Sequence, residues 1–406
     1  MKNRPATVKK HFLILFTVIA GTTVGVFSVF LTGAMAPVIS KSFPFTDTNL
    51  GIVVTIFFLS GAVFSAFFGR LADKKGGLII MIAGISTCAV CLCAIAVLVH
   101  SWQELAVFLG LCGIANSAIQ PAANHLLANT IPSKRQGTAF AIKQSAIPVT
   151  TLLAGLAVPS IALTIGWRWA FGVAGLVALV IAGITALAKK LYSFSHPSRM
   201  DPTDINQVGK TGQRGKHLLN KLPLWILALG AAFGAGAGVS LGTFIVRSCV
   251  AIHISTAQAG LVSATGSMVC LISRMGNGIL ADRRKGKHLT VVAMMLGGSC
   301  VGYILLATRI SWLVIPAVAV AFGAGWGWNG LFNFAVVTSH QDIPGLATGI
   351  TQTGVLIGSA AGPLIFGLVT TDTSYQTAWL VAAGFALIAS ASIMIGRLLL
   401  KHVSAQ

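Results

Sequence analysis

The feature that most constrains this chain is a series of apolar runs, each long enough to cross a bilayer as a helix. A hydrocarbon core about 30 Å thick needs about 20 helical residues. Twelve such runs occupy approximately residues 12–39, 48–68, 78–99, 102–127, 138–161, 167–187, 223–246, 256–279, 288–308, 311–336, 346–370 and 375–398. Period-two alternation of the kind seen in membrane barrels is absent, so only helices can satisfy the backbone in lipid. The runs predict an all-α membrane protein with twelve transmembrane helices.

The basic residues gather at alternate ends of these runs. The chain has 28 Lys and Arg against only 8 Asp and Glu, an excess that could suggest a nucleic-acid partner. If the amino terminus is cytoplasmic, however, only Lys41, Arg168, Arg247 and Arg309 fall on the outer side. This is the positive-inside pattern of membrane proteins. We therefore predict a multi-pass protein of the cytoplasmic (inner) membrane, with both termini in the cytoplasm, the lipid bilayer around it and no nucleic-acid partner.

The chain reads as two copies of one unit. A polar stretch at 189–221 separates residues 1–188 from residues 222–406, and we interpret it as a cytoplasmic linker between two six-helix bundles. The halves match at an offset of 208–209 residues, which indicates an internal repeat. The first matching pairs are Gly69 with Gly278, Leu71 with Leu280, Ala72 with Ala281 and Asp73 with Asp282. GTAFAIKQS at 137–145 matches GLATGITQT at 345–353, which pairs Gln144 with Gln352 and Lys143 with Thr351.

A short phrase recurs where the second helix of each half should meet the third. It reads GRLADKKGG at 69–77 and GILADRRKG at 278–286. We expect each copy to form a very short cytoplasmic loop, in which glycine allows close backbone approach. The carboxylates of Asp73 and Asp282 can accept hydrogen bonds from basic side chains or from a helix N-terminus.

At these residues the chain resembles the major facilitator superfamily, whose loop signature after the second helix is similar to GRLADKKGG. A weaker echo after its eighth helix is similar to GNGILADRRKGK. The resemblance covers the whole chain and implies two pseudo-symmetric bundles that rock against each other in a secondary transporter. It also implies a latch that holds the cytoplasmic side closed while the outside is open. The gating residues assigned to this latch are Gly69, Asp73, Arg274, Gly278 and Asp282.

Two polar stripes are candidates for substrate binding, because polar residues inside spans tend to face a partner or a wet cavity. In the fourth span, Asn116, Gln120 and Asn124 repeat at a spacing of four and share one helix face. In the tenth span, the stripe consists of Trp326, Asn329 and Asn333. The resemblance implies that the first, fourth, seventh and tenth helices line a central cavity, so the stripes would face each other. Alternatively, the amides join helices within one half. The repeat-related Gln144 and Gln352 complete the amide candidates.

Lys143 in the fifth span is the charged candidate. Its ammonium could snorkel to the interface, bond a neighbouring helix or contact a substrate. Contact with an anion is favoured because no Asp or Glu lies deep in any run, which leaves the lysine charge uncompensated. The same absence leaves open whether transport is coupled to an ion or to a counter-substrate, or is facilitated diffusion.

We predict a permease, expected to be monomeric, that moves a small organic solute, with an anion such as a carboxylate as the expected class. The alternatives are efflux of drugs or of neutral or cationic compounds, and a non-transporting sensor. Drug–proton exchange is disfavoured because the family's proton-coupled drug exporters carry Arg near the start of the fourth span, where Ala106 stands. No catalytic motif, metal-ligand spacing or cofactor motif is found in the sequence, so neither an enzyme nor a cofactor is predicted.

Overall fold

The structure, a computed structural model, describes residues 4–130, 142–193, 222–283, 286–340 and 343–404. This part of the chain is helical, without strands, and contains twelve helices or helix pairs long and apolar enough to cross a membrane. The prediction of an all-α membrane protein with twelve spans is confirmed, because the apolar runs form helices of spanning length.

The first half contains six spans. Its elements are α1 (Arg4–Ile39), α2 (Asp47–Lys75), α3 (Gly77–Leu98), α4 (Trp102–Thr130), α6 (Ala146–Ala157) with the π-helix η1 (Val158–Ala162), and α7 (Trp167–Ser193). Because α7 continues to Ser193, the first residues of the predicted linker are helical, and its remainder, 194–221, lies outside the described residues.

The second half also contains six spans. Its elements are α9 (Leu222–Val250), α10 (Thr256–Arg283), α11 (His288–Ala307), η3 (Ser311–Leu313), α12 (Val314–Gly325), α13 (Asn329–Ser339), α14 (Pro344–Asp372) and α15 (Tyr375–Ser404). The tenth span differs from the single helix expected at 311–336, because residues 326–328 form a turn between α12 and α13. Four glycines in GAGWGWNG lower the helix propensity at this point.

Residues 69–75 and 278–283 of the repeated phrase are helical rather than a loop, which corrects the prediction. Gly69 and Asp73 lie in the last turns of α2, and Gly278 and Asp282 lie in the last turns of α10. The chain turns only at glycines near the end of each copy, Gly76 and Gly286, each with φ of 88°. L-residues rarely adopt that conformation, so the turn itself requires glycine.

Close packing beside this turn requires glycine at a position that the sequence argument did not single out. A Cβ on Gly77 would lie 2.9 Å from the carbonyl oxygen of Ala122 in α4. In contrast, a Cβ on Gly69 would meet only Pro121, at 3.9 Å, and one on Gly278 would meet nothing within 4 Å. In this conformation, the close backbone approach in the first half is therefore made by Gly77 and not by Gly69, and Gly278 makes none in the second half.

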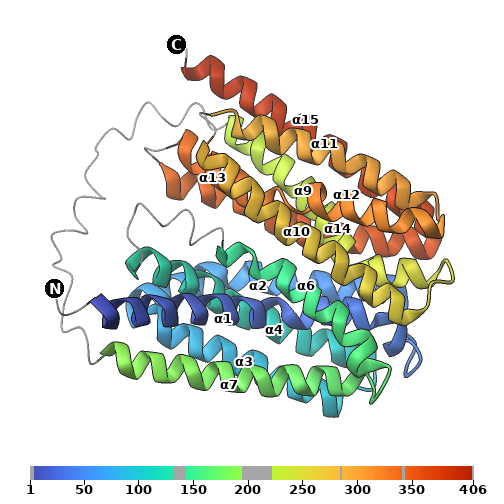
Figure 1. Cartoon of the computed structure of the whole chain (residues 1–406), viewed down its shortest axis with the longest axis horizontal. Helices are drawn as coiled ribbons and strands as arrows, with labels where there is room; N and C mark the ends of the chain where they lie inside the picture. The colour runs from blue at the N-terminus through green and yellow to red at the C-terminus, as the bar shows by residue number, and fades with distance from the viewer. Residues whose placement is uncertain (1–3, 131–141, 194–221, 284–285, 341–342, 405–406) are drawn as a thin grey trace.

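The two halves meet at one end of the molecule and separate at the other (Figure 1). We call the end where α7 finishes and α9 begins the linker end, and the other the opposite end. Contacts between the halves are made by α1 with α9, α2 with α14, and α6 with α10. In each pair they lie toward the opposite end. The backbone contacts are Gly33 with Thr243, Gly51 with Pro363, and Gly155 with Gly260.

Hydroxyl groups reinforce these contacts. Thr55 Oγ1 donates to the carbonyl of Ala360 at 2.7 Å, which joins α2 to α14. Ser267 Oγ donates to Thr151 Oγ1 at 2.7 Å, which joins α10 to α6. Since Gly51 and Gly260 stand at the same place in the repeat, at the offset of 209 that also relates Asp73 to Asp282, the α2–α14 and α6–α10 interfaces are copies of one arrangement.

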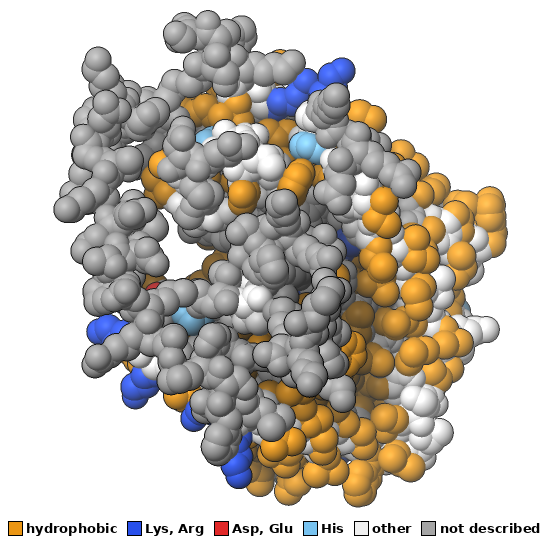
Figure 2. Space-filling model, turned by 60° about the vertical axis from the view of Figure 1, so that its left-hand side comes forward, with side chains coloured by type: hydrophobic (Ala, Val, Ile, Leu, Met, Phe, Trp, Pro, Cys, Tyr) orange, Lys and Arg blue, Asp and Glu red, His pale blue; other side chains and the backbone are white. Residues whose placement is uncertain are grey.

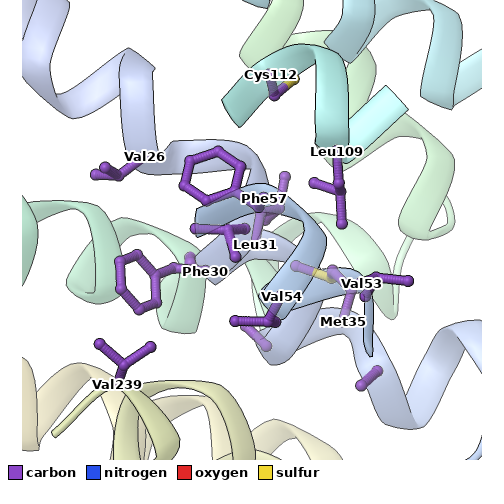
Figure 3. Close-up of a cluster of buried hydrophobic side chains, with 14 of the residues drawn as sticks. Val26, Phe30, Leu31, Met35, Val53, Val54, Phe57, Leu109, Cys112 and Val239 are labelled. Carbon is purple, nitrogen blue, oxygen red and sulfur yellow. The ribbon is translucent and has the colours of Figure 1, made fainter. Parts of the chain in front are cut away.

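Buried apolar side chains form two clusters that follow the same division. The larger cluster includes residues of both halves, and Figure 3 shows Phe30 of α1 on the side facing Val239 of α9. The smaller cluster, which includes Leu227, Trp328 and Phe332, belongs to the second half alone. The flank on the right of Figure 2 is covered by apolar side chains, as expected of a surface in contact with lipid. The halves are thus joined through a shared core at the opposite end only.

Candidate functional site

Two buried cations lie where the halves approach each other. Lys143 is 4% exposed and Arg274 is 6% exposed, and they are the only charged side chains among the buried polar residues that the structure describes. Lys143 precedes α6 in the first half, whereas Arg274 belongs to α10 in the second. A buried charge is costly unless it is paired or hydrogen-bonded, so their partners define the site.

Lys143 bonds a neighbouring helix rather than snorkelling to the interface. Its Nζ donates to Oδ1 of Asn124 in α4 at 2.7 Å. Of the alternatives that the sequence left open, a helix–helix bond is therefore present. The acceptor is a neutral amide, so the bond satisfies one ammonium hydrogen and leaves the positive charge uncompensated.

The second half contains the same pair without the charge. Nε2 of Gln352 in α14 donates to Oδ1 of Asn333 in α13 at 3.0 Å. Both pairs are 19 residues apart in sequence, and both members differ by 209 between the halves. The contacts thus match Gln352 with Lys143, which corrects the alignment of Gln352 with Gln144 and of Lys143 with Thr351. The one-residue error arose because the matched segments at 137–145 and 345–353 align at 208, whereas the contacts follow 209.

The amide stripes are bonded within their own halves. Gln120 Nε2 donates to Asn116 Oδ1 at 3.3 Å, and Asn333 Nδ2 donates to Asn329 Oδ1 at 3.1 Å. Asn116 also packs against α1, since a Cβ on Gly25 would lie 2.7 Å from its Oδ1. These two bonds each lie within one helix, whereas the bonds that join helices within a half are those of Asn124 with Lys143 and of Asn333 with Gln352. The four side chains of the two within-helix bonds stay partly exposed, so they keep capacity for a ligand.

Arg274 bonds main-chain carbonyls of both halves. Its Nη1 donates to the carbonyl of Gln144, while Nε and Nη2 donate to the carbonyl of Trp326 at 3.3 and 2.9 Å. Both carbonyls stand at helix breaks. Pro148 has no N–H to offer the Gln144 carbonyl four residues earlier, and Trp326 lies where α12 ends. The arginine thereby satisfies two backbone acceptors freed by irregular local structure.

Trp326, whose carbonyl accepts from Arg274, also contacts the first half through its ring. Its ring lies edge-on to Phe30 of α1, with ring centroids 5.3 Å apart, so it joins the halves. Room for the indole comes from α9, where a Cβ on Gly238 would lie 2.7 Å from the ring. Trp328, in contrast, is 1% exposed and packs in the smaller apolar cluster, where its Nε1 donates to the carbonyl of Gly325. Of the two tryptophans, Trp326 is the one whose carbonyl accepts from Arg274.

Acidic groups stand away from this site in the described part of the chain. Asp47 begins α2, Glu104 lies in the first turn of α4, and Asp372 ends α14. Asp73 and Asp282 lie near the linker ends of α2 and α10. The described residues contain no group of three His, Cys, Asp or Glu that could hold a metal ion. Among the described residues, the hydrogen-bond partners of both cations are therefore neutral.

Of the expected gating residues, Asp73 is exposed at the linker end. The side chain of Asp282 lies outside the described part. Arg274 was expected to belong to the same latch, but its guanidinium donates to the carbonyls of Trp326 in its own half and of Gln144 in the other. In this conformation it belongs to the polar site and not to the junctions of α2 with α3 and of α10 with α11.

At the opposite end an ion pair joins the halves, and the sequence argument did not anticipate it. Nε of Arg247 in α9 lies 3.1 Å from Oδ1 of Asp47 in α2. Arg247 Nη2 also donates to Ser40 Oγ at 3.0 Å and to the Phe45 carbonyl at 2.7 Å. We call this group the outer clasp. The available signal was that Asp47 and Arg247 both stand at outer ends of predicted runs, but their pairing depends on how the halves dock.

Comparisons with known proteins agree on one family. The family model described as Major Facilitator Superfamily matches residues 15–340 and 248–404. The chain is 27% identical over 350 residues to an uncharacterized MFS-type transporter of Mycobacterium tuberculosis (strain CDC 1551 / Oshkosh), covering 84% of this chain and 73% of that protein. It is 26% identical over 378 residues to the multidrug resistance protein MdtG of Klebsiella pneumoniae (strain 342), covering 88% and 89%.

Solved structures show the same fold. One is a bacterial homolog of the human lysosomal transporter Spinster in an inward-facing and occupied conformation, with a TM-score of 0.73 and 17% identity over 98% of this chain and 97% of that one. The unoccupied form of that homolog gives a TM-score of 0.74 at 16% identity over 97% and 98%. At such identities the likeness concerns the fold alone.

Proposed function

The chain belongs to the major facilitator superfamily, and on that premise we propose that it moves a small organic anion, such as a carboxylate, across the cytoplasmic membrane by alternating access. Membership makes it a membrane transporter. The substrate class rests on the site, because a fold that hosts many substrates does not specify one.

The observation that carries the proposal is the uncompensated charge of Lys143. The side chain is 4% exposed, and its described partner is the neutral amide of Asn124. A cation placed in this way costs free energy, about 2.5–3.5 kcal/mol at a bilayer centre and less toward an interface. An entering anion recovers that cost through a charge-assisted hydrogen bond. A cationic solute would instead meet repulsion.

The proposal also includes the orientation of the molecule in the membrane. In the described part, most Lys and Arg lie at the linker end, whereas Lys41, Arg168, Arg247 and Arg309 lie at the opposite end. Lys and Arg side chains are visible on the linker-end face in Figure 2. The positive-inside rule then places the linker end in the cytoplasm. With the opposite end closed, this conformation would be inward-facing.

The latch is part of the same proposal. Gly69, Asp73, Gly278 and Asp282 would hold the linker ends together once the opposite end opens. The exposure of Asp73 agrees with this, because a latch carboxylate has no partner across the halves while the linker ends stand apart.

Thermal stabilisation of the purified protein tests the substrate class. The panel contains small carboxylates, phosphates, neutral solutes and aromatic cations. A ligand at 100 times its Kd adds about 2.7 kcal/mol to the folded state. We expect stabilisation by an anion that is lost in Lys143→Gln and kept in Lys41→Gln, whose lysine is exposed at the opposite end. Flux of that anion into proteoliposomes then tests transport.

Export of drugs is the second candidate, because a relative of similar length is named a multidrug resistance protein. The aromatic pair Phe30 and Trp326 could stack on a planar cation. This candidate predicts stabilisation by aromatic cations only, with Lys143→Gln as responsive as the native chain. That result would exclude the anion proposal.

A further inference from the structure

We propose that Arg274 is the second cation of the substrate site, so that the transported anion carries two negative charges. The inference rests on the proposed function and narrows its substrate class from organic anions to dianions. It also gives Arg274 a role distinct from the latch, as a group that must change partners when substrate binds.

The first ground is the charge balance. Lys143 and Arg274 are the only buried charged side chains in the described residues, and both are cations. The acidic residues of α2 and α10 stand near helix ends, with Asp47 at the opposite end and Asp73 and Asp282 at the linker end. One monoanion would compensate a single charge and leave the other unpaired, whereas a dianion compensates both.

The second ground is that the two cations flank one stretch of chain. Nη1 of Arg274 donates to the carbonyl of Gln144, the residue directly after Lys143. The lysine comes from the first half and the arginine from the second, so a ligand that engages both connects the halves. Asn124 and Gln144 beside them are at least partly exposed, which leaves the polar surroundings open to a ligand.

The third ground is the kind of acceptor that Arg274 holds. A guanidinium bonds a carboxylate with two parallel, charge-assisted hydrogen bonds, which are stronger than bonds to neutral carbonyls. Here the acceptors are the carbonyls of Gln144 and Trp326, exposed by helix breaks. A carboxylate can therefore displace the Gln144 carbonyl from Arg274. Releasing that bond removes one link between the halves as the ligand forms another.

A charge ladder of ligands tests the proposal. Dicarboxylates of increasing chain length, their monomethyl esters and their dimethyl esters are titrated into the purified protein at a pH where free carboxyl groups are ionised. The ester removes one charge while keeping nearly the same shape. We expect the best dicarboxylate to bind about tenfold to a hundredfold more tightly than its monoester, because one charge-assisted pair is lost.

Variants then show which residue binds the second negative charge of the ligand. In Arg274→Gln, the dicarboxylate and its monoester should bind equally within about twofold. Arg274→Lys keeps the positive charge but not the guanidinium, and it should keep the preference for the dianion. This variant therefore distinguishes the effect of the charge from the effect of the arginine's bonds to the main chain. Arg309→Gln is the matched control, because Arg309 also bonds a main-chain carbonyl, that of Ala251, but within one half.

The outcomes separate this inference from the proposed function. Equal affinity of the native chain for dianion and monoester overturns the inference and leaves anion transport standing. An unchanged preference in folded Arg274→Gln also overturns it. If no anion of either charge binds, both fail together. Should Arg274→Gln not fold, the native ladder and Arg274→Lys still decide.

Discussion

Lys143 and Gln352 occupy the same place in the two halves, and each donates to an asparagine 19 residues away in sequence. They differ in charge, because Gln352 is a neutral amide, and in exposure, because Lys143 is buried and Gln352 is partly exposed. The repeat thus supplies an internal control at the residue scale. If anion binding depends on charge at this pseudo-symmetric position, the charge should act from either half.

We predict that exchanging the two residues restores part of the affinity lost in a single variant. Lys143→Gln should weaken anion binding about tenfold or more, since a hydrogen bond to a charged group contributes about 1.5–3 kcal/mol. In the double variant Lys143→Gln with Gln352→Lys, Asn333 can accept from the introduced ammonium. Titration calorimetry with the stabilising anion measures both affinities.

The single variant Gln352→Lys is the control for this exchange. It should bind the anion at least as tightly as the native chain, because the site then has an additional cation. If the double variant binds no better than Lys143→Gln, the lysine acts through its particular bond to Asn124 and not through the charge of the site.

At the element scale, α9 and α14 pack backbone to backbone. The sequence contains Gly354, Gly358 and Gly362 at a spacing of four, and in the structure each faces the main chain of α9. A Cβ on Gly358 would collide with the carbonyl group of Ala232. Small residues at such contacts let transmembrane helices approach closely. The ladder in α14 therefore joins helices of one half, and the glycines of α9 also make room for Trp326.

Gly358→Ala should destabilise the second half, because backbone atoms of α9 cannot yield as a flexible side chain would. We expect a loss of about 1–3 kcal/mol, typical of overpacking, measured as a lower midpoint of unfolding in detergent. Gly384→Ala is the matched control, since Gly384 is also helical and its Cβ would meet nothing within 4 Å. That change should be neutral or slightly stabilising. Equal midpoints for both variants would contradict the packing argument.

At the scale of the whole molecule, the outer clasp holds the opposite end closed. Asp47 and Arg247 are 14% and 16% exposed, so their pairing is only partly screened by solvent. The bonds of Arg247 to Ser40 and Phe45 reach the same half as Asp47. Alternating access requires this group to break each time the opposite end opens.

Arg247→Gln should shift the conformational equilibrium toward opening of that end. Removing the arginine leaves Asp47 without its ion-pair partner, a cost of about 1–3 kcal/mol in the closed state. Spin labels at Lys41 and Arg309, both exposed at the opposite end, should show a larger population of long distances. Arg168→Gln is the control because Arg168 bonds Ala96 within the first half. An unchanged distance distribution in Arg247→Gln would show that the clasp does not govern closure.

Asp73→Asn should shift the conformational equilibrium toward the state that is closed at the opposite end. If Asp73 belongs to the latch that closes the linker end, its loss leaves the closed-outside conformation favoured and lowers flux, while insertion and folding stay normal. Spin labels at Lys74 and Lys287, exposed at the linker end of each half, measure this separation. Normal flux in Asp73→Asn at normal expression would refute the latch assignment.

The sequence by itself determined the class, the spans and the repeat. Transfer of a segment into lipid depends on the sum of its own residues, so apolar runs of spanning length identify helices without knowledge of their neighbours. Because the apolar pattern reports only on neighbouring residues, it did not locate every helix end correctly. The pattern placed Asp73 in a loop, whereas the helix continues to Lys75 and turns at Gly76. It also missed the turn at residues 326–328.

Only the tertiary structure decided which polar groups meet. Lys143 could equally have snorkelled, bonded a helix or stood free, and the packing of α4 beside it selected Asn124. Arg274 is far in sequence from Gln144, and its contact depends on a carbonyl that Pro148 cannot satisfy. The outer clasp likewise required the two halves to dock. Polar groups in lipid must find partners, but the partner is chosen by distance in space, which a one-dimensional pattern does not contain.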